Sequence, residues 1–203
     1  MKLYNSMGPN PHVVRMFVAE KGLDLPTEEV DLMGGANRRA DYLSKNPSGG
    51  LPCLELDDGT FLSEITAICE YLEETHPEPA LLGATPEQRA ETRMWTRRID
   101  LGICEPMANG FRFSEGLPLF ETRMRCLPEA ADGLKAMARD KLEWLDGLVT
   151  GRTWICGDRF TLADILLYCF LAFGANVGQP LPDSLKNLQA WYGRVGARES
   201  ANA

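Results

Sequence analysis

Strand-like patterns occur only in the first 75 residues of this chain, and a proline-rich segment separates them from a purely helical remainder. In the first part, apolar residues alternate with polar ones over residues 1–6, 25–33 and 53–63, and helical spacing fills the intervals. Asp58-Gly59, inside the third of these segments, is a hairpin turn signal. The order β-α-β-α-β-β-α therefore predicts an α/β sandwich around a mixed sheet.

The remainder of the chain has helical patterns only. A long helix over residues 87–111 should be disturbed near Pro106, since proline cannot donate a hydrogen bond within a helix. Thr161 and Asp164 resemble a capping box, ahead of an apolar helix that should be buried. We therefore expect an α/β domain over residues 1–76, a linker over residues 77–86 and an all-helical domain over residues 87–203.

Composition narrows the function classes. The net charge of −8 argues against nucleic-acid binding, which needs clustered Lys and Arg, and no apolar run is long enough to span a membrane. Residues 1–22 contain no secretory hydrophobic region, so we expect a cytoplasmic protein with reduced cysteines. The six cysteines form no CxxC pair and the two histidines are far apart, which argues against a His/Cys metal site.

Pro52 stands where a central strand should begin, after Gly49 and Gly50, although proline cannot donate to a sheet ladder. Two explanations follow from these residues. A cis bond before Pro52 would turn the backbone so that the N–H and C=O of Leu51 face outward and pair with an extended peptide ligand. A trans proline would merely end a loop.

A wider motif surrounds this proline. The segment "NPSGGLPCLELDDGTFLSEITAICEYLEETHPEPALLG", followed by a helical half with "GDRFTLADI", resembles the glutathione transferase superfamily, and the resemblance covers nearly the whole chain. It implies a thioredoxin-like N-terminal domain, an all-helical C-terminal domain and glutathione as co-substrate, with no metal. It also implies an enzyme that transfers the glutathione thiolate to hydrophobic electrophiles. The chain looks most like fungal and bacterial members that lack the usual catalytic Tyr, Ser or Cys.

The resemblance assigns glutathione-binding roles to residues of this motif. It makes Pro52 the cis-proline of the family and Leu51 the residue whose backbone pairs with the cysteinyl part of glutathione. Glu64 would face the γ-glutamyl amine. Ile65 stands where the family normally has Ser, so its N–H at a helix N-terminus is left for the γ-glutamyl carboxylate. Thr66 is a possible substitute hydroxyl, but helical spacing turns it about 100° away.

A short helix is predicted within residues 36–47, ended by Asn46-Pro47. Basic side chains around this second helix are candidates for holding the glycyl carboxylate of glutathione. These candidates are Arg38, Arg39 and Lys45. A solvated surface charge is the alternative interpretation for each of them. Residues 55–74, by contrast, contain seven acids and no base.

The group that stabilises the glutathione thiolate stays open. In the family it is a Tyr, Ser or Cys near the start of the first helix, but the matching positions here are Pro9 and Asn10. Asn10 is the favoured candidate, because its amide and the helix dipole can both stabilise an anion. The alternatives are Ser6 or Tyr4 in a differently shaped loop, and Ser114 or Arg112 from the helical half together with water.

Two more residues near this position have weaker claims. His12 would help the thiolate only if its ring were protonated, and a solvated or capping role is the alternative. Cys53 could form a mixed disulfide with glutathione only if it were exposed, and strand alternation predicts that it is buried.

The helical half should supply the pocket for the electrophile. Its candidate lining residues are Met107, Phe111, Arg112 and Phe113, although aromatic side chains at such spacing also suit a core. Because family members are usually dimers, we also expect a homodimer whose interface involves the helices around Glu64–Glu74 and Glu87–Met107.

Two other functions stay open on the same fold. One is glutathione-dependent peroxide reduction, dehalogenation or isomerisation. The other is a binding or interaction module with little catalysis, since fold does not determine function. The missing Ser at Ile65 and the missing standard thiolate donor both favour this second alternative.

Overall fold

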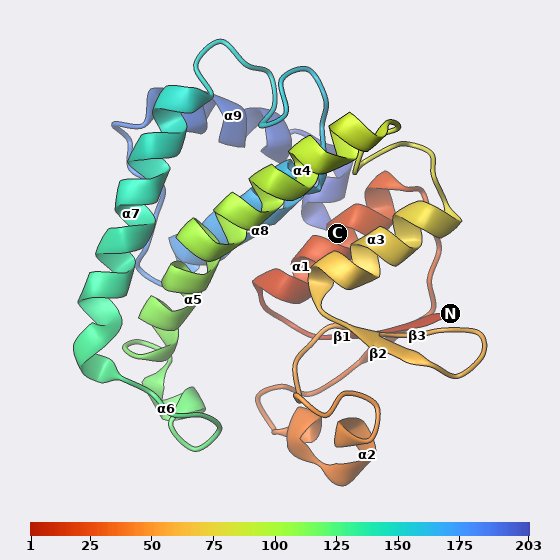
Figure 1. The fold of residues 1–203 in the computed structure, drawn as a ribbon. Coiled ribbons are helices and arrows are strands. Elements are labelled where there is room, and N and C mark those ends of the chain that lie inside the picture. Colours follow the sequence, from red (N-terminus) through yellow and green to blue (C-terminus); the bar gives the residue numbers. More distant parts are fainter. The chain divides into compact units, whose positions relative to one another are not determined.

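The computed structural model describes every residue from Met1 to Ala203 and divides the chain into two compact units (Figure 1). Unit 1 comprises Met1–Leu81 together with Glu199–Ala203, and unit 2 comprises Leu82–Arg198. From the sequence we expected Glu199–Ala203 in the helical domain, but this segment packs with unit 1 instead.

Unit 1 is built on a four-stranded sheet in the order β2-β1-β3-β4. The strands are β1 (Lys2–Asn5), β2 (Thr27–Glu29), β3 (Cys53–Glu55) and β4 (Phe61–Ser63). β1 pairs in parallel with β2 and antiparallel with β3, and β3 pairs antiparallel with β4. This mixed sheet confirms the predicted fold class for the first part of the chain.

Helices cover both faces of the sheet (Figure 1). α1 (Pro9–Glu20) and α3 (Ile65–Thr75) lie side by side on one face, and α2 (Ala40–Leu43) lies on the other. Tyr4 and Cys53, directly opposite each other in the sheet, pack with Tyr42 of α2. α2 is shorter than the sequence predicts, because Arg39 is extended (φ −81°, ψ 156°) and separates it from a 3-10 turn at Ala36–Arg38.

Unit 2 contains helices and no strands. They are α4 (Pro86–Ile99), α5 (Glu105–Arg112), α6 (Leu117–Phe120), α7 (Ala131–Leu148), α8 (Leu162–Asn176) and α9 (Lys186–Gly196). A π-helical segment, Asp100–Cys104, joins α4 to α5 directly before Pro106, at the disturbance that the sequence predicts. A wider turn there suits a residue that has no N–H to donate.

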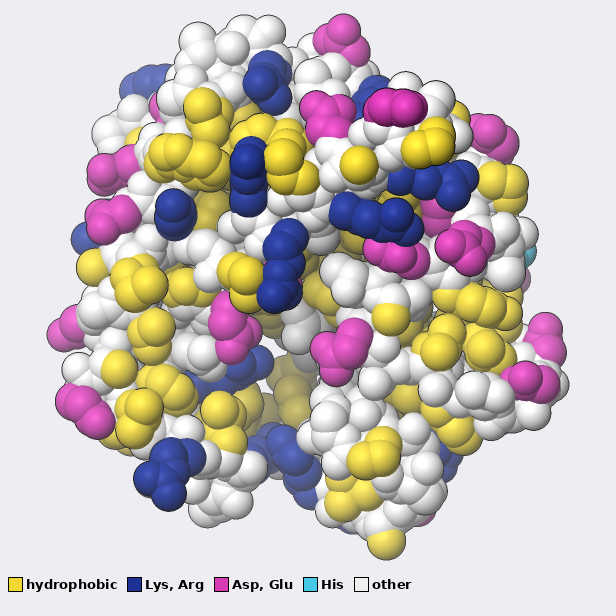
Figure 2. Space-filling model, viewed as in Figure 1, with side chains coloured by type: hydrophobic (Ala, Val, Ile, Leu, Met, Phe, Trp, Pro, Cys, Tyr) yellow, Lys and Arg dark blue, Asp and Glu magenta, His cyan; other side chains and the backbone are white.

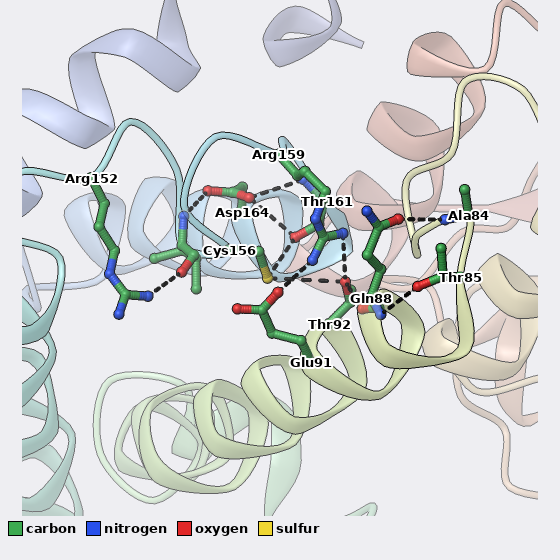
Figure 3. Close-up of polar contacts among 11 residues, drawn as sticks. Ala84, Thr85, Gln88, Glu91, Thr92, Arg152, Cys156, Arg159, Thr161 and Asp164 are labelled. Atoms are coloured by element: carbon green, nitrogen blue, oxygen red, sulfur yellow. Dashed lines mark hydrogen bonds and ion pairs between the residues drawn. The ribbon is translucent and has the colours of Figure 1, made fainter.

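A buried polar cluster starts α8. Thr161 and Asp164 form the predicted capping box (Figure 3). The Asp164 carboxylate also accepts the Ile155 N–H at 2.9 Å and the Trp191 indole N–H at 2.8 Å. α8 is buried almost all round, as its apolar sequence indicates. None of the helices in the structure combines the length and the apolar composition that crossing a bilayer requires.

Candidate functional site

Sheet topology brings three chain segments to one edge of unit 1. β1 ends at Asn5 and leads into α1, so the first turn of α1 lies beyond the carboxyl end of β1. β3 is antiparallel to β1 and pairs Cys53 with Tyr4, so the residues before Cys53 lie at the same edge. β4 reverses direction again, and α3 starts there directly after it. Asn10, Leu51-Pro52 and Glu64-Ile65 therefore share this edge.

Leu51 is the residue at this edge with main-chain groups beyond the sheet. The Leu51–Pro52 peptide bond is cis, and β3 begins only at Cys53. The Leu51 side chain packs against the buried cluster around Tyr4 and Tyr42. Its main-chain N–H and C=O therefore precede Cys53, the first paired residue of β3, and lie where an added extended segment would continue the sheet.

The start of α3 is conformationally unusual. Glu64 is the one residue other than glycine with a positive φ, at 70°, and its side chain is exposed. Such a backbone costs about 1–3 kcal/mol and is found preferentially at ligand sites. No side chain caps α3, so the N–H groups of Ile65 and Thr66 stay available to an anion.

The start of α1 carries Asn10 between two prolines. Pro9 and Pro11 have no N–H, so Asn10 supplies the main-chain donor of this turn, and its side chain is half-buried. No side chain caps this helix either. The N-terminus of α1 therefore offers fewer free main-chain N–H groups than an ordinary helix N-terminus does.

Two alternative thiolate donors of unit 1 are already engaged. The Ser6 hydroxyl is buried and donates to the Val30 carbonyl at 2.8 Å, an arrangement that disfavours Ser6 as a donor to the thiolate. The Tyr4 hydroxyl donates to Glu55 at 2.8 Å, and burial raises the pKa of Tyr4. Neither hydroxyl has a proton left to stabilise a sulfur anion.

His12 and Cys53 do not favour thiol chemistry. The His12 ring contacts the Ala201 carbonyl at 3.2 Å, and burial lowers the pKa of His12, which disfavours the protonated form. Cys53 is fully buried, as predicted, and burial raises the pKa of its thiol to about 11. A mixed disulfide at Cys53 is therefore disfavoured.

Basic residues flank the loop that leads into Leu51. The Arg38 guanidinium is exposed and donates to the Ser48 carbonyl at 3.2 Å, while Arg39 is exposed as well. Lys45 donates to the Asp41 carbonyl at 2.9 Å and lies over the Tyr4 ring. These cations keep donors to spare, because each bond uses one of several N–H groups.

Known proteins match this arrangement over the whole chain. A family model described as "Glutathione S-transferase, N-terminal domain" matches residues 7–75, and one described as "Glutathione S-transferase, C-terminal domain" matches residues 121–199. "Glutathione S-transferase 2" of Saccharomyces cerevisiae is 33% identical over 199 residues, which is 95% of this chain and 84% of that protein. The chain belongs to the glutathione S-transferase family.

Other members of the family agree with the fold. A crystal structure of a glutathione S-transferase domain-containing protein from Marinobacter aquaeolei VT8 is 37% identical, with a TM-score of 0.93 over 99% of this chain and 100% of that one. "Maleylacetoacetate isomerase" of Pseudomonas aeruginosa is 34% identical over 170 residues, which is 82% of this chain and 78% of that protein. The thioredoxin-like unit followed by a helical unit is thus the glutathione transferase fold.

The residues expected to line the electrophile pocket of this glutathione transferase split into two pairs. Met107 and Phe113 are buried, and Met107 packs against Gly174 of α8, so these two residues belong to the interior of unit 2. Phe111 and Arg112 are half-buried. Phe111 meets Phe120 and Phe173 edge-on, at ring distances of 6.1 and 5.2 Å.

Ser114 lies at the end of α5 and is also engaged. Its hydroxyl donates to the Gly110 carbonyl or to the Glu115 carboxylate, and a hydroxyl has one proton to give. Arg112 donates to the side chain of Asn109 at 2.9 Å. Of the proposed thiolate donors, Asn10 is the one whose side chain makes no hydrogen bond in the structure.

Sequence reasoning missed the residues that shape the loop before Leu51. The Gly50 carbonyl accepts from the Tyr42 hydroxyl at 2.7 Å and from the Asn46 amide at 2.9 Å. The Asn37 amide donates to the Gly49 carbonyl at 2.7 Å. The one signal in the sequence is the pair of asparagines flanking α2, which suit loops that bond their own backbone.

Proposed function

We propose that this glutathione transferase lowers the pKa of the thiol of bound glutathione and transfers the thiolate to hydrophobic electrophiles in the cytoplasm. The observation that carries the proposal is the meeting of three segments at one sheet edge: the Leu51 main chain, the start of α3 and the start of α1. They offer a strand-like edge for a peptide and two positive helix ends for its charges.

Each part of glutathione has a matching group in unit 1. The cysteinyl backbone pairs with the N–H and C=O of Leu51. The γ-glutamyl carboxylate takes the N–H groups of Ile65 and Thr66, which need no serine hydroxyl, and its amine faces the Glu64 carboxylate. The glycyl carboxylate is held by Arg38 or Lys45.

The reaction then needs only a stabilised thiolate. Asn10 donates from its side-chain amide to the sulfur, and the dipole of α1 adds to the effect. The thiol proton leaves to water. The sulfur attacks the electrophilic carbon, and the new S–C bond forms as the leaving group departs with its electron pair.

Replacing Asn10 with Ala is expected to raise the thiol pKa of bound glutathione by about one unit or more, because a hydrogen bond to a charged group contributes roughly 1.5–3 kcal/mol. The absorbance of the thiolate, followed against pH, measures this. Asn176→Ala, at an exposed asparagine at the end of α8, is the matched control and should leave the thiol pKa unchanged. An unchanged pKa in Asn10→Ala would remove Asn10 from the mechanism.

Retention on immobilised glutathione, followed by turnover assays, tests the function itself. We expect retention and conjugation of chlorodinitrobenzene. The similarity to a maleylacetoacetate isomerase favours glutathione-dependent isomerisation as the second candidate function. Peroxide reduction, assayed with cumene hydroperoxide, and dehalogenation are further alternatives on the same fold. Retention without any turnover would indicate a binding module, and loss of retention would overturn the proposal.

We also propose that two copies of the chain form a homodimer through oppositely charged surfaces. Unit 1 has fifteen Asp and Glu against six Lys and Arg, whereas unit 2 has fourteen against fifteen, which gives −9 and +1 of the total −8. Exposed apolar and basic side chains gather on α4, the π-helical segment and α7 (Figure 2). This α4–α7 surface consists of Met94, Arg97, Arg98, Leu101, Lys141 and Trp144.

The partner surface is the acidic α3, where Glu74 is exposed and Glu70 is half-buried. Arg97→Glu should weaken the dimer about tenfold or more, because it places like charges opposite each other, and added salt should weaken the wild-type dimer. Sedimentation velocity measures the dissociation constant. Arg139→Glu makes the same charge change at an exposed residue of α7 that is not part of the α4–α7 surface, and it should have little effect. A monomer at every concentration would contradict the proposal.

A further inference from the structure

The segment Glu199–Asn202 forms a 3-10 turn against α1 rather than continuing α9 (Figure 1). Ser200 and Ala201 are buried, with 7% and 6% of their surface exposed, and the next two residues are exposed. The burial of these two small residues shows that the segment packs against the rest of unit 1.

Two polar contacts hold this segment near the two ends of α1. The His12 ring donates from Nε2 to the Ala201 carbonyl at 3.2 Å, because a carbonyl can only accept. The Ser200 hydroxyl donates to the Glu20 carboxylate. His12 and Glu20 are eight residues apart, so they lie on one face of α1, and the segment spans that face.

Few hydrogen bonds hold the first turn of α1, although Pro11 is buried. Pro9 and Pro11 supply no N–H, no side chain caps the helix, and the bond from the His12 N–H to the Gly8 carbonyl is long, at 3.3 Å. Gly8 has φ 113°, a conformation that adds no restraint from a side chain. His12 belongs to this same turn, two residues after Asn10, and its ring contact joins the turn to Glu199–Asn202.

We propose that Glu199–Asn202 is a strap that positions the first turn of α1, and with it Asn10, for the glutathione thiolate. His12 and Ser200 are then positioning residues for the reaction, although neither touches the sulfur. The inference rests on the proposed function, because it assigns the strap an effect on the thiol that Asn10 serves. Freeing the turn leaves the site assembled but misplaces its donors, which weakens thiolate stabilisation rather than glutathione binding as a whole.

A chain that stops at Arg198 tests the strap. We expect the thiol pKa of bound glutathione to rise by about 0.5 unit, the size of a helix N-terminus contribution of 0.3–1 kcal/mol. At a pH well below that pKa, kcat/KM should fall about threefold. Glutathione affinity, measured by calorimetry at low pH where the thiol is protonated, should change much less. A merely structural role would lower the melting temperature and leave the thiol pKa where it was.

Point variants keep the test independent of the truncation. His12→Leu should reproduce the rise in thiol pKa. His12→Gln, whose amide can still donate to the Ala201 carbonyl, should keep the thiol pKa close to the wild-type value. Asn202→Ala, at an exposed position of the same turn, is the control without effect. If the wild-type protein binds glutathione with a lowered thiol pKa and the truncated chain does the same, the strap is wrong and the proposed function stands. If the wild-type protein does not lower that pKa, the proposed function is what fails.

Discussion

Replacing Asp164 with Asn is expected to lower the free energy of unfolding by about 2–5 kcal/mol, because at least one buried donor loses its acceptor and the new NH₂ group is buried against it. One carboxylate oxygen accepts the Ile155 and Trp191 N–H groups, and the other accepts the Thr161 N–H at 3.0 Å. An amide can replace only one of these oxygens. Its NH₂ group then faces donors, whichever way it turns.

Thr85→Ala gives a matched comparison at the start of another helix. Thr85 caps α4 by accepting the Gln88 N–H at 3.3 Å, but it is exposed, so the loss should be about 1 kcal/mol (Figure 3). Urea unfolding followed by far-UV circular dichroism measures both variants, with an unchanged slope as the sign that only stability changed. Equal losses for the two variants would show that Asp164 acts as an ordinary cap and not as the centre of a buried cluster.

The features that were predictable from the sequence are those that neighbouring residues determine. The turn at Asp58-Gly59 and the capping box at Thr161 and Asp164 depend on residues within a few positions of each other. The disturbed helix at Pro106 follows from the chemistry of one residue. Such local rules are enough for the element order, and hence for the mixed sheet and the fold class.

The features that were not predictable depend on partners far along the chain. Ser6 looks like a free hydroxyl in the sequence, but its acceptor is the carbonyl of Val30, which parallel pairing of β1 with β2 brings alongside. Tyr4 likewise donates to Glu55 across the antiparallel pair. Only the sheet register decides which side chains are engaged, and one residue of slip would exchange the faces. The sequence therefore predicts which segments meet at the sheet edge, but it does not predict which side chains there are free to donate to a ligand.

A buried ion pair between α1 and α3 accounts for the second large effect that we expect. Lys21 directly follows α1, and its side chain is fully buried, while Glu73 of α3 keeps 5% of its side-chain surface exposed. The ammonium contacts the Glu73 carboxylate and donates to the carbonyls of His76 and Pro79 at 2.8 and 2.6 Å. The carboxylate also accepts the Leu81 N–H at 3.2 Å. The pair thus ties both helices to the segment that follows α3.

Lys21→Met is expected to lower the free energy of unfolding by about 3–5 kcal/mol, because it leaves the Glu73 carboxylate buried without its cation. The double variant with Glu73→Leu should recover part of the loss, since it removes the stranded charge, and a double-mutant cycle by urea unfolding measures the coupling. Lys2→Met breaks an exposed ion pair with Glu28 in the same unit and should change stability far less. Because the pair fixes α1 against α3, Lys21→Met should also weaken glutathione binding at the opposite ends of these helices, where Asn10 and Ile65 lie. A loss as small as that of Lys2→Met would show that water reaches the pair and that it does not hold the two helices together.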